Sequence, residues 1–175
     1  MKYRRISLFG GPGSGKSTLA PKLYSDLKFY NYNVELVREW VKLWACEKKE
    51  IISYDQVYIF AKQLNLEDRL LRSGIDFVVS DSPLFLQCYY ASDMCPEVSD
   101  ELISLAKKVE IKYPSLNIFL KRDHKYDPVG RYQTEEEALE IDVNLKKFLK
   151  DNEVSYSEEN SDDVLSVVMD VIKQG

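Results

Sequence analysis

Short apolar runs alternate along the chain with longer amphipathic stretches. The runs that predict β-strands are Arg5–Phe9, Asn33–Val37, Ile75–Ser80, Leu116–Leu120 and Val154–Tyr156. They are rich in β-branched and aromatic residues with little alternation, which is typical of strands buried on both faces. Between these runs lie longer stretches in which apolar residues recur at helical spacing. In Tyr54–Leu71, the expected core face comprises Val57, Phe60, Ala61, Leu64 and Leu71. The pattern predicts a three-layer α/β fold, with a five-stranded parallel sheet flanked by helices.

Polar residues mark the expected starts of several helices. Ser53 with Gln56, and Thr134 with Glu137, have the spacing of capping boxes. Ser82–Pro83 predicts an N-cap serine with proline at the first helical position. These starts fall after predicted strands or loops, so they support the alternation of strands and helices.

The length and composition favour one globular domain over residues 1–175. The net charge of -5 argues against duplex nucleic acid as the main ligand, because such binding needs a basic surface. Cys46, Cys88 and Cys95 lack metal-ligand spacing and predict reduced, buried thiols. No apolar run is long enough to span a membrane, and no signal-peptide pattern is present. We therefore expect a cytoplasmic protein of undetermined oligomeric state.

A glycine-rich loop follows the first predicted strand. Gly10, four residues and then Gly15-Lys16-Ser17 complete the G-x-x-x-x-G-K-[ST] pattern between a strand and a helix. Such a loop points backbone N–H groups at nucleotide phosphates. Lys16 is expected to reach the β- and γ-phosphates, and the Ser17 hydroxyl to bind Mg²⁺. The predicted nucleotide contacts in this segment are Gly11, Gly13, Ser14, Gly15, Lys16, Ser17 and Thr18.

Two carboxylates follow predicted strands, where ligands bind in open α/β sheets. Asp81 ends an apolar strand and suits coordination of magnesium, although it could instead help to cap the Ser82–Pro83 helix. Glu39 is placed to take the proton of an attacking hydroxyl, or is a solvated acid of the next helix. Arg38 could orient the acceptor, or pair with Glu39 or Glu35.

The segment between these acids supplies a possible wall for the acceptor. Gln56 and Gln63 lie seven residues apart at the edge of the expected core face. Their amides could hydrogen-bond a nucleobase or carboxamide, with Gln63 the better candidate. The aromatic candidates for stacking, most of them expected in the core, are Tyr58, Phe85, Tyr89 and Tyr90.

A basic segment after the fourth strand concentrates positive charge in an acidic chain. Its basic residues are Lys121, Arg122, Lys125 and Arg131. A mobile basic loop of this kind can close over phosphates and stabilise charge in the transition state, although a solvated charged loop would look the same. The role of His124, the only histidine, stays open.

Five segments in order, GGPGSGKSTLA, VELVREWVK, YIFAKQL, VVSDSP and YDPVGRYQTEEEALEID, resemble small P-loop kinases of the nicotinamide riboside kinase type. The last segment is most similar to phage-borne members, for which the location would be the host cytoplasm. The resemblance spans nearly the whole chain. It implies a nucleoside- or nucleotide-kinase fold with a five-stranded parallel core and a lid near residues 122–133.

The same resemblance implies site roles. Glu39 and Asp81 would be the acidic pair, Arg122 and Arg131 the lid arginines, and Gln63 an acceptor contact. The chain departs from the pattern of nucleoside monophosphate kinases, which commonly have Asp-Arg where this chain has Asp81-Ser82. That arginine helps to hold an acceptor phosphate, so its absence favours an uncharged acceptor hydroxyl unless Arg38 compensates.

The leading hypothesis is an ATP- and Mg²⁺-dependent kinase acting on a hydroxyl of a nucleoside or nucleotide-like small molecule. A second hypothesis moves the acceptor onto a hydroxymethyl-pyrimidine in phage DNA, reached through a local basic lid. A third is a regulatory P-loop ATPase with a protein partner. The sequence leaves open the acceptor, the choice of ATP or GTP, and whether Glu39 or Asp81 is the base.

Overall fold

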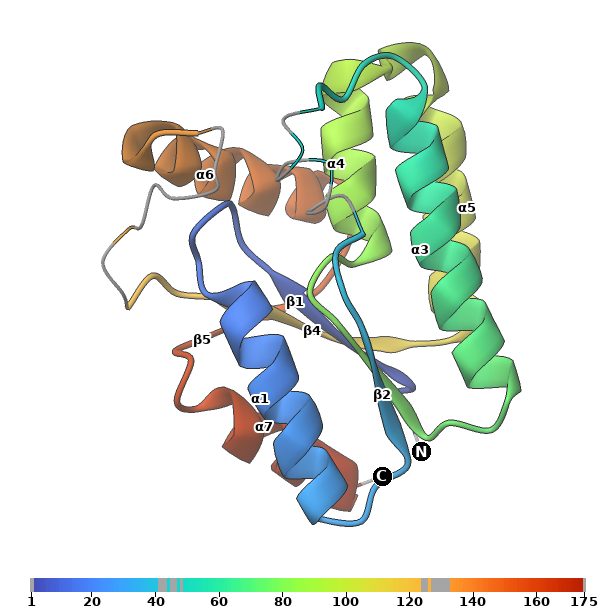
Figure 1. The fold of residues 1–175 in the computed structure, drawn as a ribbon, viewed down its shortest axis with the longest axis vertical. Helices are drawn as coiled ribbons and strands as arrows, with labels where there is room; N and C mark the ends of the chain where they lie inside the picture. The colour runs from blue at the N-terminus through green and yellow to red at the C-terminus, as the bar shows by residue number, and fades with distance from the viewer. Residues whose placement is uncertain are drawn as a thin grey trace.

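A five-stranded parallel sheet forms the centre of the computed structural model, which describes residues 2–40, 44, 47, 49–123, 126 and 133–174. The strands are β1 (Arg5–Phe9), β2 (Val34–Val37), β3 (Phe77–Ser80), β4 (Ser115–Leu120) and β5 (Ser157–Glu159). Their order across the sheet is β2-β3-β1-β4-β5, so β1 is central (Figure 1). The predicted α/β class and parallel sheet are confirmed.

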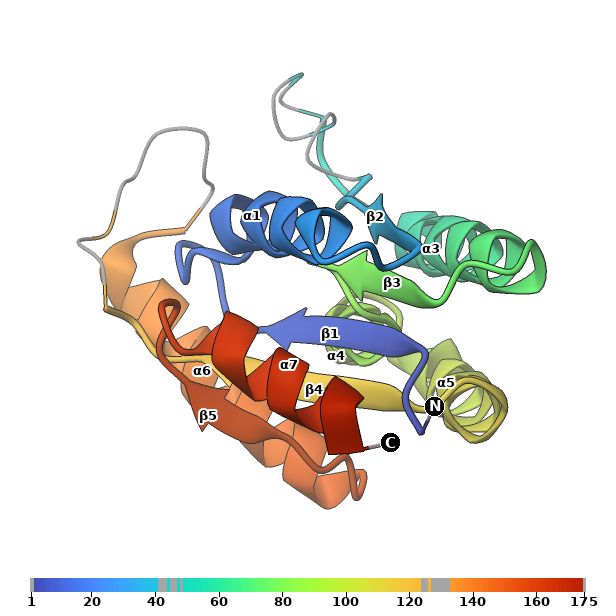
Figure 2. The ribbon, with the colours of Figure 1, turned by 90° about the horizontal axis from the view of Figure 1, so that it is seen from below.

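Two layers of helices cover the sheet (Figure 2). On one face, α1 (Lys16–Phe29) and α7 (Val164–Gln174) pack on β1, β3 and β4 through Leu23, Leu27 and Val168. The helices of the other layer are α3 (Asp55–Arg72), α4 (Leu84–Met94), α5 (Ser99–Lys112) and α6 (Glu135–Asp151). A short 3₁₀ helix, η1 (Pro96–Val98), joins α4 to α5. Both faces of the sheet pack against hydrophobic cores, which explains why the strand sequences show little alternation.

The register brings the carboxyl ends of four strands together. Phe9 of β1 pairs with Phe119 of β4, and Ser7 pairs with Ser80 of β3. Val37 of β2 lies beside Ser80 in turn. The loops after β1, β2 and β3 therefore start at the same edge of the sheet, and this edge is where the predicted site residues lie.

The fifth strand lies three residues later than the sequence predicts. Val154 is 8% exposed and packs in the core, and its backbone N–H bonds to Leu149 O at the end of α6. The strand itself, Ser157–Glu159, is polar because it lies at the sheet edge and pairs only with β4. The prediction of Val154–Tyr156 was wrong because Val154 packs in the core directly after the turn that ends α6, before the strand begins.

One of the three predicted helix starts is confirmed. Thr134 and Glu137 form a reciprocal capping box at the start of α6. The Ser53–Gln56 box was wrong: α3 begins at Asp55 without a side-chain cap, and Gln56 is buried and donates to Gln87. Ser82–Pro83 is offset by one position, since Pro83 is the N-cap residue and the Ser82 hydroxyl accepts a hydrogen bond from the Gln87 side chain.

The buried face of α3 is more polar than its apolar spacing predicts. Ala61 is exposed, whereas Gln63 and Glu67 are each 2% exposed. Glu67 pairs with Arg5 of β1 at 3.2 Å, and Arg5 also pairs with Glu110 of α5. This buried network joins α3, β1 and α5, and it supplies the partners that buried charges require.

The remaining predictions about the chain as a whole concern thiols and membranes. Cys88 and Cys95 are buried and free, as expected, and burial raises the pKa of the Cys88 thiol to about 12. Cys46 lies outside the described residues. Among the helices that the structure describes, we find no segment with the length and apolarity that crossing a bilayer requires.

Candidate functional site

The phosphate loop connects the end of β1 to the start of α1. Gly13 has φ +80° and Gly15 φ +90°, conformations that favour glycine. The Gly15 carbonyl accepts hydrogen bonds from the N–H groups of Thr18 and Leu19, which starts the helix. The first N–H groups of α1 therefore face the loop, where they can bind an anion.

Lys16 lies inside the loop. Its Nζ is 2.5 Å from Gly10 O and 2.9 Å from Gly11 O, so the loop carbonyls hold the ammonium in place. Burial lowers the pKa of Lys16 to about 8, and the negative charges of Glu39, Asp142 and Asp81 act in the opposite direction. A bound phosphate would add negative charge beside this ammonium group and favour its charged form.

The hydroxyls of the loop differ in their surroundings. Ser14 is 2% exposed, and its Oγ lies 3.2 Å from Lys16 Nζ. Ser17 and Thr18, in the first turn of α1, are exposed. The structure thus leaves the Ser17 hydroxyl accessible at the position where the sequence predicts a metal ligand.

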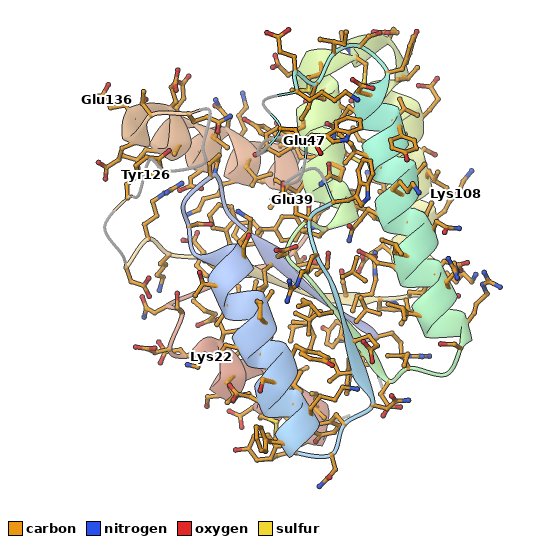
Figure 3. The ribbon with its side chains drawn as sticks, viewed as in Figure 1. Lys22, Glu39, Glu47, Lys108, Tyr126 and Glu136 are labelled. Atoms are coloured by element: carbon orange, nitrogen blue, oxygen red, sulfur yellow. The ribbon has the colours of Figure 1, made fainter. Side chains whose placement is uncertain are left out.

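The two predicted carboxylates meet at the edge of the sheet. Asp81 directly follows β3 and is 4% exposed. Its Oδ1 accepts the backbone N–H of Glu39 at 2.7 Å, which ties the segment after β2 to the end of β3. Both carboxylates act electrostatically on Lys16. Figure 3 shows Glu39 beyond the carboxyl end of β2, and the neighbouring Arg38 is exposed.

Gln63 and Gln56 are both buried beneath this edge. The Gln63 amide nitrogen donates to Ser80 Oγ at 2.8 Å and to Glu67 Oε1 at 2.6 Å. Both of its hydrogens are therefore used within the protein, and only its carbonyl could face an acceptor. Gln56 donates to Gln87 Oε1 at 2.6 Å. The structure thus gives Gln63 a supporting position directly beside the residue that precedes Asp81.

Aromatic side chains gather on the side of Glu39. Trp40 is 5.1 Å from Trp44 and 5.3 Å from Tyr58, measured between ring centroids. Sequence reasoning considered Tyr58 and missed both tryptophans, although Trp40 directly follows the candidate acid. Burial and the negative charge of Glu39 both raise the pKa of Tyr90.

The other predicted aromatics are divided between the core and its margin. Phe85 is 3% exposed and belongs to the hydrophobic core. The Tyr89 ring packs against Tyr90 and Phe148 at centroid distances of 5.4 and 5.7 Å. Of the four candidates only Phe85 is a buried core residue, whereas Tyr89 and Tyr90 are partly buried against the core and Tyr58 is exposed, so the expectation that most of them are core residues was wrong.

The segment after β4 packs against the phosphate loop through Tyr126 and places Arg122 beside it. Arg122 donates from Nε to Asp142 Oδ2 at 2.5 Å and from Nη2 to Ala138 O at 3.0 Å, so α6 holds it. Tyr126, labelled in Figure 3, has its ring against the loop, since a Cβ on Gly13 would lie 2.7 Å from that ring. Of the other predicted lid residues, Lys125 and Arg131 lie outside the described residues, as does His124.

Asp142 is a site residue that sequence reasoning missed. Its Oδ1 accepts the Gly11 N–H at 2.5 Å, so that amide, predicted to contact nucleotide, bonds to α6 in this structure. Five acids occur between residues 135 and 142. Nothing in their spacing distinguishes the one that α6 turns towards the phosphate loop.

The fold and the loop place the chain in a known class. A family model described as an AAA domain matches residues 5–165, and the chain therefore belongs to that family. Its strand, glycine-rich loop, lysine and helix start are the nucleotide-binding elements of P-loop proteins.

Two solved structures share this fold. The crystal structure of NadR protein in complex with NR has a TM-score of 0.69 at 17% sequence identity, covering 90% of this chain and 45% of that chain. The crystal structure of APE1195 has a TM-score of 0.52 at 20% identity, covering 99% and 96%. The chain thus spans less than half of the NadR chain. No curated protein matches the sequence.

Proposed function

We propose that the protein is a phosphotransferase that moves the γ-phosphate of ATP to a hydroxyl of a nucleoside or nucleotide-like small molecule. The observation that carries the proposal is the hydrogen bond that joins the Glu39 backbone to Asp81 at the carboxyl edge of the sheet, where the charges of both residues act on Lys16. A loop that only holds nucleotide needs the lysine. The second carboxylate, on the segment after β2, suits an acceptor hydroxyl.

The proposed chemistry is one displacement. The acceptor oxygen forms a bond to the γ-phosphorus while the bond to the β–γ bridging oxygen breaks and ADP leaves. Glu39 orients the hydroxyl and takes its proton, while Lys16 and Arg122 stabilise charge on the transferred group, together with Arg131. Arg38 and the Gln63 carbonyl are proposed acceptor contacts.

Mg²⁺ fits the residues at this edge. Within the described ranges, no three His, Cys, Asp or Glu side chains cluster as a metal site. This agrees with Mg²⁺ chemistry, because the ion is commonly held by one or two protein oxygens together with waters and phosphates. Ser17 and Asp81 would hold it, and when bound it would neutralise charge on the phosphates.

The acceptor is proposed from the site and from the structural likeness. The structure of NadR was solved in complex with NR. Trp40, Trp44 and Tyr58 provide ring surfaces beside Glu39, which suits an acceptor with a planar ring. We therefore place nicotinamide riboside among the first acceptors to test, together with nucleosides and nucleoside monophosphates.

The test is transfer of labelled γ-phosphate from ATP to this panel, with DNA containing hydroxymethyl-pyrimidine as a separate arm. A phosphorylated small molecule supports the proposal, and labelled DNA would move the acceptor to a polymer. Hydrolysis of ATP with no acceptor labelled, and stimulated by a protein partner, would contradict the proposal in favour of a regulatory ATPase.

The Glu39→Gln variant tests the assignment of the base. We expect kcat to fall by about 10²-fold or more while ATP affinity stays unchanged, because the carboxylate acts on the hydroxyl rather than on the nucleotide. Glu35→Gln is the matched control, since Glu35 is a partly exposed acid of β2 paired with Lys28. An unchanged kcat in Glu39→Gln, with kcat lost in Asp81→Asn, would transfer the role to Asp81.

A further inference from the structure

Asp142 connects two parts of the donor site that are far apart in the chain. One carboxylate oxygen accepts the Gly11 N–H of the phosphate loop, and the other accepts Arg122 Nε, each at 2.5 Å. The Arg122 and Asp142 side chains are 16% and 13% exposed, so both bonds are largely shielded from water. Charge-assisted bonds with this geometry are among the strong ones in proteins.

The phosphate loop packs closely against α6 and Arg122 around these bonds. A Cβ on Gly11 would lie 2.9 Å from Ala138 O and equally close to Asp142 Oδ1, so α6 lies directly against the loop backbone. Arg122 Nη1 would be 3.4 Å from a Cβ on Gly13. The guanidinium is thus held beside the loop residue at which bound phosphates are expected.

We propose that Asp142 is a positioning residue, which fixes the Arg122 guanidinium and the Gly11 end of the phosphate loop in the arrangement used for transfer. The proposal rests on the function proposed above. Arg122 would touch the phosphoryl group, and Asp142 would act through it. A guanidinium positioned in advance stabilises the transition state without first having to be ordered.

The carboxylate is required because it has two acceptor oxygens. An asparagine at this position has one acceptor oxygen, so it can keep the bond to Gly11 or the bond to Arg122 but not both. Asp142→Asn therefore separates the two parts with almost no change in shape. Glu140→Gln removes the same charge from an exposed position on the same helix and is the matched control.

The kinetic test measures kcat and the KM for ATP in Asp142→Asn, Arg122→Ala and the double variant. We expect Asp142→Asn to lower kcat about 10-fold, with a smaller change in KM and no change in Glu140→Gln. In the Arg122→Ala background the same substitution should lower kcat by a smaller factor, because only the part of its effect that passes through Gly11 remains. An equal loss in both backgrounds, or a faster Asp142→Asn enzyme, would overturn the proposal.

A second readout needs no turnover. In the nucleotide-free Asp142→Asn protein, hydrogen exchange should be faster either at the Gly11 amide or in the peptide leading to residue 123. Exchange in both segments should be unchanged in Glu140→Gln. Unchanged exchange in both segments would refute the positioning role. If no acceptor is ever phosphorylated but exchange rises as expected, the proposed function fails while the bridge made by Asp142 stands.

Discussion

Gly13 is a loop residue with no room for a side chain. It combines φ +80° with a Tyr126 ring 2.7 Å from the position of a Cβ, whereas Gly74 has φ +91° and no atom within 4 Å of that position. Both positions strain an L-residue, but only Gly13 adds a clash. Substitutions at Gly74 therefore report backbone strain alone, whereas substitutions at Gly13 report strain together with the contact between the loop and Tyr126.

Gly13→Ala and Gly74→Ala should both lower the free energy of unfolding, by about 1 kcal/mol for strain alone. Only Gly13→Ala should also weaken nucleotide binding, by about 10-fold or more, because the methyl group displaces the ring and the loop. Urea unfolding and calorimetric titration with ATP check the two effects. Equal nucleotide affinity in the two variants would contradict the close packing of Tyr126 on the loop.

Lys16 gives nucleotide binding a dependence on pH. Its pKa in the empty protein is about 8, and bound phosphates favour the charged form, so binding above this pH must take up a proton. Affinity should therefore hold below pH 8 and fall as pH rises through 8 to 9.5, by up to about tenfold per unit. Burial is the main cause of this low pKa; the charges of Glu39, Asp142 and Asp81 raise the pKa of Lys16, and the charge of Arg122 lowers it.

Titration with ADP without added Mg²⁺, in buffers of different ionisation enthalpy, measures both the affinity and the proton uptake. Lys16→Met should bind more weakly at every pH and lose the proton uptake. A wild-type affinity that is flat from pH 7.5 to 9.5 would show that the ammonium keeps its charge throughout.

The residues at strand ends were the predictable part of the site. Asp81 and Glu39 could be named because carboxyl ends of parallel strands converge, which depends only on locating two strands. Asp142 could not, since it reaches the loop from the middle of a helix. The orientation of α6 that brings it there is set by packing on β4 and α4.

At the scale of elements, the two predicted capping boxes offer a direct comparison. Thr134 accepts the Glu137 N–H, and the Glu137 side chain accepts the Thr134 N–H at 2.7 Å. Ser53 has the same sequence spacing but lies at φ +48° and caps nothing. The difference arises because Gln56 is drawn into the core towards Gln87 and is not available at the helix start.

Thr134→Ala should lower the free energy of unfolding by about 1 kcal/mol, because α6 loses its N-cap. Ser53→Ala should change it by less than about 0.5 kcal/mol. Thermal or urea unfolding of the two variants under identical conditions is the check. A loss in Ser53→Ala as large as that in Thr134→Ala would mean that the serine stabilises its turn in another way.

The central strands and the edge strand β2 were predicted to within two residues, whereas the other edge strand, β5, was not. All five residues of the segment RISLF are buried, as expected at the centre of a sheet. In contrast, β5 is short and polar, and its position depends on pairing with β4 rather than on its own sequence. The position of β5 could not be predicted from Val154–Tyr156, because Val154 is buried through its place after the end of α6 and not through strand pairing. Edge strands are specified by pairing, which local hydrophobicity does not record.

For the whole molecule, the buried network around Arg5 adds polar contacts between β1, α3 and α5, which also share one apolar core. Arg5 is 3% exposed and contacts Glu67 of α3, Glu110 of α5 and the Tyr113 carbonyl. Removing one member leaves an uncompensated charge in the interior, and such losses are large. Surface pairs such as Lys146–Glu158, at 36% and 39% exposure, have no comparable effect.

Arg5→Met should lower the free energy of unfolding by about 3 kcal/mol or more, and Glu67→Met in the same chain should recover part of that loss. Lys146→Met, the surface control, should cost less than about 1 kcal/mol. Urea unfolding of the three variants provides the comparison. If the double variant is less stable than Arg5→Met, the buried pair is not the source of the loss.

The central place of β1 also has a consequence for how the chain folds as it is made. Of the five strands of the sheet, β1 is synthesised before the others, yet its neighbours β3 and β4 pair with it through Val78 and Ser115, much later in the chain. Until both arrive, the apolar residues of RISLF have no permanent cover. Such long-range pairing slows folding, so a newly made chain must protect its first strand the longest.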